Sequence, residues 1–166
     1  MITLGIDPGI AITGFGIIEE KHDGNLHVIN FGVIRTSADL FQADRLVHLY
    51  QQIKSLILLH KPDMGAVEKL FFERNVRTAL NVGQARGVAL LVMAESGIKI
   101  SEYTPLEVKQ AVAGYGGAEK KQVQQMVKTI LDLETVPRPD DAADALAVAI
   151  CHIHSAKIRN LYENDT

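Results

Sequence analysis

Residues 2–36 read ITLGIDPGIAITGFGIIEEKHDGNLHVINFGVIRT, and this stretch decides the fold that we predict. It contains three runs of β-forming residues separated by two turn signals, Asp7-Pro8-Gly9 and His22-Asp23-Gly24-Asn25. The runs cover residues 2–6, 13–20 and 26–36. Because consecutive strands joined by short turns pair with each other, the stretch predicts an antiparallel meander. Gly14 and Gly16 lie on one face of the second strand, where another element can approach the backbone closely.

After residue 36 the pattern changes to helices that alternate with short apolar strands. A capping box with proline at the first helical position, Thr104-Pro105-Leu106-Glu107, marks one helix start. The predicted helices cover 44–60, 75–95, 104–113, 119–133 and 140–154, and the added strands cover 64–67 and 98–103. This order predicts an α/β fold with a mixed five-stranded sheet flanked by helices. We assign residues 1–158 to one domain and residues 159–166 to a flexible tail.

Composition excludes several classes of protein. The chain has 166 residues, of which 47% are apolar and 22% charged, values typical of one globular domain and not of a disordered chain. A single cysteine excludes an internal disulfide framework and a zinc site built on cysteines. The longest apolar runs fall far short of the ~20 residues of a membrane span, and Met1–Asp7 lacks the basic start of a signal peptide. We therefore expect a cytoplasmic protein without a membrane partner.

Charge is unevenly distributed along the chain. The formal net charge is −3, yet residues 69–128 carry 9 basic and 5 acidic side chains, while both flanking segments are acidic. A protein that combines an anionic metal site with a phosphate-binding face would show this distribution. Ordinary variation of surface charge explains the counts equally well.

Four carboxylates stand where a metal site could form. Asp7 and Glu68 each end a short apolar strand, at the rim of the sheet where open α/β sheets bind ligands. Asp141 and Asp144 are three apart in the first turn of a predicted helix, so they share a face. Four acids gathered at one rim would repel one another, and hard oxygen ligands of this kind suit Mg²⁺ or Mn²⁺.

Each acid also has an ordinary structural interpretation. Asp7 could be a turn residue, Glu68 a surface residue at a strand end, and the helical pair could stabilise the helix dipole. Spacing does not choose between Asp141 and Asp140, because Asp140 and Asp144 are four apart and also share a face.

Several motifs follow one another in a fixed order along the chain, beginning with Gly5-Ile6-Asp7-Pro8-Gly9 and Thr13-Gly14-Phe15-Gly16. The set continues, over about residues 3 to 154, with Val67-Glu68 before Leu70-Phe71, Asn81–Gly87, Val108-Lys109-Gln110, Ala118-Glu119-Lys120 and Asp141–Ala147. Asp-Pro-Gly alone is a weak signal, whereas the ordered set is highly specific and resembles the RuvC family of Holliday-junction resolvases. The resemblance implies an RNase H-like fold and a crossover junction endodeoxyribonuclease that resolves Holliday junctions by paired symmetric nicks during recombination and DNA repair.

The resemblance also assigns roles to residues. It implies two Mg²⁺ ions, with Mn²⁺ as an alternative, held by Asp7, Glu68, Asp141 and Asp144. It places Lys109 and Lys120 near the scissile backbone as catalytic residues and Phe71 at the junction centre. The Asp-Ala-Ala-Asp context selects Asp141 over Asp140. Lys69, directly after Glu68, departs from the neutral or acidic residue that we expect there. The further candidate DNA contacts are Arg74, Arg77, Arg86 and Lys121, each of which could equally be a plain surface residue.

The resemblance further implies a homodimer and a partnership with the RuvA-RuvB branch-migration complex. A four-way junction is approximately two-fold symmetric, so a C2 dimer would supply two matched active sites. The predicted helix 75–95 offers a dimer surface through small and apolar residues such as Ala79, Val82, Ala85 and Ala89, or else packs on the sheet.

Two other functions are compatible with parts of the sequence. Asp-x-Gly after a strand, followed by a strand with glycines, also occurs in phosphate-binding ATPases and sugar kinases, but those folds need two lobes and this chain is too short for both. A non-catalytic junction-binding module would bind DNA without a divalent metal and never nick it. The presence of all four matched acids counts against this second alternative.

Overall fold

The protein is described here from a computed structural model. The structure describes residues 1–69 and 76–164, with side-chain detail for 1–69 and 78–157. Five strands form one sheet in the order β3-β2-β1-β4-β5. The strands are β1 (Ile2–Asp7), β2 (Ile12–Glu20), β3 (Leu26–Arg35), β4 (Met64–Glu68) and β5 (Lys99–Tyr103). β1, β2 and β3 form the predicted antiparallel meander, and β4 and β5 extend it as parallel strands. The mixed five-stranded sheet is confirmed.

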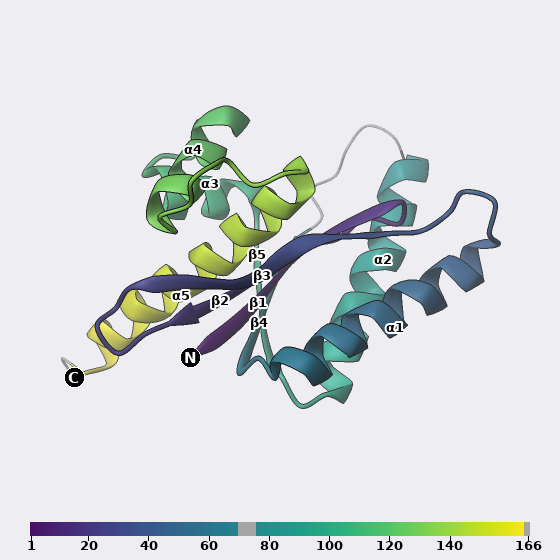
Figure 1. Cartoon of the computed structure of the whole chain (residues 1–166), viewed down its shortest axis with the longest axis horizontal. Coiled ribbons are helices and arrows are strands. Elements are labelled where there is room, and N and C mark those ends of the chain that lie inside the picture. Colours follow the sequence, from purple (N-terminus) through teal and green to yellow (C-terminus); the bar gives the residue numbers. More distant parts are fainter. Residues whose placement is uncertain (70–75, 165–166) are drawn as a thin grey trace.

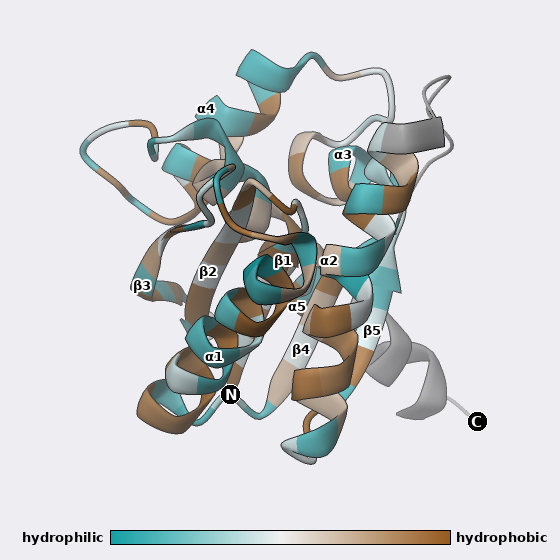
Figure 2. Ribbon diagram, turned by 90° about the vertical axis from the view of Figure 1, so that its right-hand side faces the viewer, coloured by the Kyte–Doolittle hydropathy of each residue, from teal (hydrophilic) through white to brown (hydrophobic). Residues whose placement is uncertain are grey.

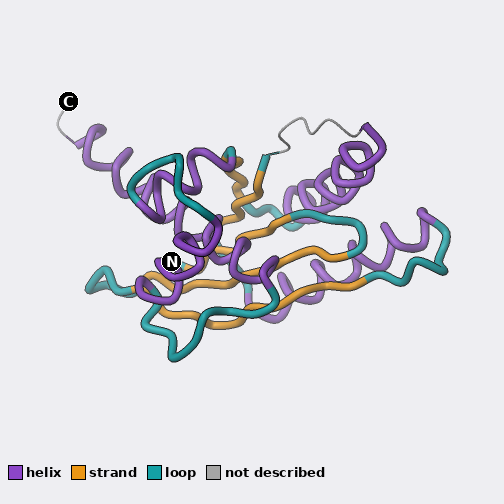
Figure 3. The backbone as a smooth tube through the Cα atoms, turned by 90° about the horizontal axis from the view of Figure 1, so that it is seen from above, coloured by secondary structure: helices purple, strands orange, loops and turns teal. Residues whose placement is uncertain are grey.

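Helices cover both faces of this sheet (Figure 1; Figure 3 shows it from above). They are α1 (Gln42–His60), α2 (Val76–Glu95), α3 (Pro105–Ala113), α4 (Lys120–Ile130) and α5 (Asp140–Asn164). Helices α1 and α2 bury one apolar cluster against the sheet, around Leu4, Ile6 and Ile17. Helices α3, α4 and α5 bury a second cluster on the opposite face, around Ile18 and Leu146. The molecule is thus a three-layer α/β structure with one core on each side of the sheet.

Helix α5 lies directly on the strands because glycines of β1 and β2 leave room for it. A Cβ atom added at Gly5 would lie 2.2 Å from the carbonyl oxygen of Ala145, and one added at Gly16 would lie 2.7 Å from Leu146. Real Cβ atoms do not approach other atoms this closely, so only glycine permits the contact. The close approach predicted for the glycines of the second strand is confirmed, and the approaching element is α5.

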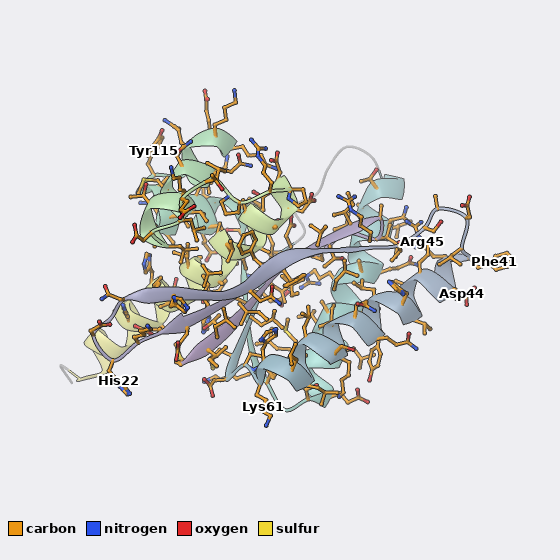
Figure 4. All side chains as sticks on the ribbon, viewed as in Figure 1. His22, Phe41, Asp44, Arg45, Lys61 and Tyr115 are labelled. Atoms are coloured by element: carbon orange, nitrogen blue, oxygen red, sulfur yellow. The ribbon has the colours of Figure 1, made fainter. Side chains whose placement is uncertain are left out.

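The sequence places most element boundaries within a few residues, and two boundaries differ from the prediction. Helix α1 begins at Gln42 and not at Asp44; the preceding residue, Phe41, offers no side-chain cap, so the start carries no local signal. Phe41 projects outward from this end, while Arg45 Nε reaches back to Thr36 Oγ1 at 2.8 Å (Figure 4). Helix α5 continues to Asn164, so residues 159–164 of the predicted tail are helical. The predicted capping box at Thr104 and Glu107 is confirmed.

None of the helices within the described residues is long and apolar enough to cross a membrane. On α2, Ala85 and Ala89 are fully buried in the core beneath the helix. These two alanines therefore pack on the sheet, and the suggestion that they contribute to a dimer surface is wrong.

Candidate active site

Asp7 and Glu68 emerge side by side at the carboxyl ends of two neighbouring parallel strands. Strands β1 and β4 are in register at Ile6 and Val67, so the next residue of each strand reaches the same rim. The two carboxyl groups are hydrogen-bonded to each other. Two acids that are 61 residues apart in the chain are thereby fixed at one point of the sheet edge.

Gly14 brings the start of α5 to the same point. It pairs with Asp7 across the antiparallel β1–β2 ladder. A Cβ atom at Gly14 would lie only 1.9 Å from the carbonyl oxygen of Asp141, so the helix start touches β2 directly beside Asp7. Asp144 follows one helical turn later on the same side of α5. The four acids predicted from the sequence therefore come together at one rim.

The electrostatics of the cluster agree with this placement. Burial, followed by the negative charges of Glu68, Asp144 and Asp141, raises the pKa of Asp7 to about 8. Burial also raises the pKa of Glu68, and the charge of Asp144 adds to that shift. The pKa of Asp144 is raised mainly by burial, although Lys120 opposes the shift. Without a cation the cluster thus resists carrying four negative charges.

Two lysines line the pocket beside these acids. Lys109 from α3 and Lys120 from α4 surround, with Glu68 and Asp144, a pocket of about 270 Å³. Lys120 Nζ lies 2.8 Å from Asp144 Oδ2. Burial lowers the pKa of Lys120, but the hydrogen bond to Asp144 and the nearby acids raise it above its ordinary value. Both lysines predicted to act near the scissile backbone therefore adjoin the acidic cluster.

Asp140, which spacing alone could not distinguish from Asp141, has different partners. Its Oδ1 accepts a hydrogen bond from Arg138 Nη1 at 2.5 Å, and its Oδ2 lies 3.8 Å from Lys120 Nζ. The acids on α5 whose charges raise the pKa of Asp7 are Asp141 and Asp144. Asp140 thus lies at the edge of the cluster: its charge raises the pKa of Asp144 and of Lys120 but is not among those that raise the pKa of Asp7. Sequence reasoning does not single out Arg138, whose only local signal is its place between two prolines just before the acids.

The remaining predicted DNA contacts lie elsewhere or outside the described residues. Arg86 forms an ion pair with Glu102 of β5 and is half-buried, which accounts for its charge without DNA. Lys121 is exposed on α4, next to Lys120. Arg77 lies in α2, but its side chain is outside the described residues, as are Phe71, Phe72 and Arg74 entirely.

The donors suit a hard divalent cation in type and charge, although they are now paired with other groups. Within residues 1–69 and 78–157, no three acidic, histidine or cysteine side chains are already arranged around a metal position. Asp7 and Glu68 share a hydrogen bond, and Asp144 is paired with Lys120. A divalent cation would neutralise these acids in place of the proton shared by Asp7 and Glu68 and the ammonium group of Lys120. Four carboxylates at one rim match the oxygen ligands that Mg²⁺ and Mn²⁺ prefer.

The raised pKa of Asp7 predicts that metal-free protein loses stability as pH rises. An acid with a higher pKa in the folded state binds its proton more tightly there, so the free energy of unfolding falls between Asp's ordinary pKa of 3.8 and about 8. One pKa unit corresponds to about 1.4 kcal/mol. We expect Tm in EDTA to fall by at least about 3 °C between pH 6 and pH 9, measured calorimetrically. Asp7→Asn should flatten this dependence; an equal loss in the variant would contradict the assignment.

Comparisons with known proteins give this arrangement a family context. A family model described as crossover junction endodeoxyribonuclease RuvC matches residues 3–152. The chain is 56% identical over 162 residues to the RuvC of Roseiflexus sp. (strain RS-1), covering 97% of this chain and 96% of that protein. It is 52% identical over 165 residues to the RuvC of Caldicellulosiruptor saccharolyticus, covering 99% of both.

Solved structures agree with the sequence comparison. The RuvC of T. thermophilus in complex with a Holliday junction substrate superimposes with a TM-score of 0.87 at 33% identity, covering 95% of this chain and 96% of that one. The yeast mitochondrial Holliday junction resolvase Ydc2 superimposes with a TM-score of 0.72 at 16% identity, covering 98% of this chain and 83% of that one, which shows a shared fold.

Proposed function

This chain belongs to the RuvC family of crossover junction endodeoxyribonucleases, and we propose on that basis that it resolves Holliday junctions by paired symmetric nicks. The observation that carries the proposal is the meeting of Asp7, Glu68, Asp141 and Asp144 at one rim of an RNase H-like sheet. These acids come from three separate elements, and the core does not require them there. The repulsion among these four carboxylates is explained if the site holds cations and a phosphate.

We propose that the four acids hold two Mg²⁺ ions, with Mn²⁺ able to replace them. When bound, such a pair polarises the scissile phosphate and stabilises charge on the attacking and leaving oxygens. Asp7 and Glu68 fix the position of the centre, because both project from the ends of paired strands. Asp141 and Asp144 complete it from α5, which the glycines of β1 and β2 hold against the sheet.

Lys109 and Lys120 supply positive charge on the pocket side of the acids. Each ammonium group can donate hydrogen bonds to a phosphate oxygen and stabilise the charge that develops in the transition state. Exposed Lys121 extends this basic surface along α4. The resemblance adds three further residues to the proposal. Phe71 would unstack bases, and Arg74 and Arg77 would contact phosphates. Lys69 adds an exposed charge directly after Glu68.

A homodimer is part of the proposal, since two nicks related by symmetry need two sites. Helix α2 offers an exposed surface on the side away from its buried alanines. Leu80 and Leu91 are 64% and 61% exposed and, eleven residues apart, lie on one stripe of the helix together with Gln84 and Gly87. Figure 2 shows hydrophobic turns of α2 on the side of the molecule turned to the viewer. The RuvA-RuvB complex as a partner and the cytoplasm as location are proposed from the family alone.

A charge placed on this stripe should prevent dimerisation. We expect Leu80→Asp combined with Leu91→Asp to be monomeric in sedimentation velocity at micromolar concentration, because two carboxylates would face each other across a symmetric contact. Its nicks should no longer be paired. Leu59→Asp, on the equally exposed end of α1, serves as the control and should leave the oligomeric state unchanged. A double variant that sediments as wild type would remove α2 from the interface.

The proposed function is tested by incubating the purified chain with a synthetic four-way junction, with and without Mg²⁺. Symmetric nicks in opposite strands that require the cation are expected. Nicks of similar number in linear duplex DNA would contradict junction specificity, and binding without nicks under either Mg²⁺ or Mn²⁺ would favour a non-catalytic junction-binding module.

A further inference from the structure

Asp140 is an acid beside the proposed metal site that the proposed function does not use. It is the first residue of α5 and is half-buried. Both of its carboxylate oxygens face cations, Oδ1 toward Arg138 and Oδ2 toward Lys120. Arg138 stands between Pro137, which is buried, and Pro139, so its backbone has little freedom. The Arg138 contact fixes the carboxylate while leaving its second oxygen directed at Lys120.

Lys120 depends on the acids of α5 for its position. It is the first residue of α4, where the helix dipole disfavours a positive charge, and the first turn of α4 contains no acid. Its side chain is 55% exposed, so packing does not fix the ammonium group. The two acids in contact with Nζ are Asp144 at 2.8 Å and Asp140 at 3.8 Å.

A divalent cation in the site would affect the contact of Lys120 with Asp144 but not its contact with Asp140. Asp144 is one of the acids that we assign to the metal ions, and a divalent cation at its carboxylate would compete with the ammonium group of Lys120. Asp140 contacts Arg138, and its charge is not among those that raise the pKa of Asp7, so we assign it to no metal ion. The charge of Asp141 also acts on Lys120, but Asp141 is assigned to the metal ions as well. Once Asp141 and Asp144 bind cations, Asp140 is the acid on α5 left to attract Lys120.

We propose that Asp140 is a positioning residue, which keeps Lys120 beside the scissile phosphate when a divalent cation occupies Asp144. This inference rests on the proposed function. It assigns Asp140 no metal and no contact with DNA. Arg138 supports the same role by holding the other carboxylate oxygen.

The first test asks whether Asp140 is a metal ligand. Mn²⁺ is titrated into the protein without DNA and the free ion is followed by electron paramagnetic resonance. We expect Asp140→Asn to bind Mn²⁺ within about threefold of wild type, since only a nearby charge is lost, and Asp144→Asn to bind at least about tenfold more weakly. Equal weakening in both variants would make Asp140 a ligand and overturn the inference.

The second test asks whether Asp140 acts through Lys120, by a double-mutant cycle on single-turnover junction cleavage in Mg²⁺. Asp140→Asn alone should slow cleavage about three- to tenfold at saturating protein, which is the scale of coupling between neighbouring groups. In a Lys120→Met background the same change should alter the rate less than twofold. Asp140→Glu should recover part of the rate. Additive losses would show that Asp140 acts independently of Lys120.

Glu134→Gln is the control for loss of one exposed acid ahead of α5 and should cleave as wild type. Unfolding temperatures of all variants in EDTA show whether a slower rate reflects misfolding. If the wild-type chain leaves the junction intact, both the proposed function and this inference fall. If wild type cleaves but the Asp140 cycle is additive, the inference alone is overturned.

Discussion

Asp7→Asn is expected to abolish junction cleavage while leaving junction binding intact. Asp7 lies where the charges of Glu68, Asp141 and Asp144 converge, so no other side chain can replace it as a ligand shared by the cluster. Removing one preorganised electrostatic contact typically costs about 100- to 1,000-fold in rate, and loss of a shared metal ligand should reach or exceed that range. The measurement is single-turnover cleavage of a labelled four-way junction in Mg²⁺, with binding followed by fluorescence anisotropy in EDTA.

The matched control is Asp44→Asn, the same chemical change at an exposed acid in the first turn of α1. Figure 4 shows Asp44 beside Phe41 at the end of α1, far from the start of α5. It should cleave at the wild-type rate. Cleavage by Asp7→Asn within tenfold of wild type would remove Asp7 from the metal centre. Loss of binding together with cleavage would instead indicate a structural defect.

Gly14→Ala is expected to have the second largest effect, through the fold and not through chemistry. The new methyl group would lie 1.9 Å from the carbonyl oxygen of Asp141, and backbone atoms on both sides leave no flexible group to move aside. The start of α5 must therefore shift away from Asp7. Overpacking of this kind costs about 1–3 kcal/mol, which corresponds to a fall in Tm of roughly 2–12 °C. A displacement of about 1 Å at reacting groups can cost on the order of 100-fold in rate.

Gly87→Ala separates this steric effect from the general effect of replacing glycine. Gly87 is an exposed residue of α2, and a Cβ atom there would meet nothing within 4 Å. Because alanine favours helix by up to about 1 kcal/mol, this variant should keep or raise Tm. A Gly14→Ala protein that melts and cleaves like wild type would show that α5 does not need its close approach to β2.

The acids at the strand ends were predictable because each directly follows a short apolar run. Asp7 before Pro8-Gly9 and Glu68 after Met64–Val67 mark carboxyl ends of strands, and parallel pairing brings such ends together. The two glycines of β2 also predicted that another element approaches the strand closely. Their partner could not be known, because a strand's sequence does not say which helix crosses it.

Other features depend on packing between distant segments, which local patterns do not record. Asp140 and Asp141 look equivalent by spacing. The family motif selects Asp141, and in the structure the contacts with Arg138 and Gly14 separate the two acids. Arg86 is indistinguishable by charge from a DNA contact, yet β5 supplies Glu102 as its partner. The start of α1 also differs from the prediction, because Phe41 before it supplies no side-chain cap.

Diffraction from crystals of the chain soaked in Mn²⁺, collected at the manganese absorption edge, tests the central claim most directly. Two anomalous peaks roughly 4 Å apart are expected, bounded by the carboxylates of residues 7, 68, 141 and 144, with Lys120 moved off Asp144 toward Asp140. The account would be contradicted if no peak appeared at this rim at saturating Mn²⁺. It would also be contradicted if the ions were bound by acids elsewhere on the surface.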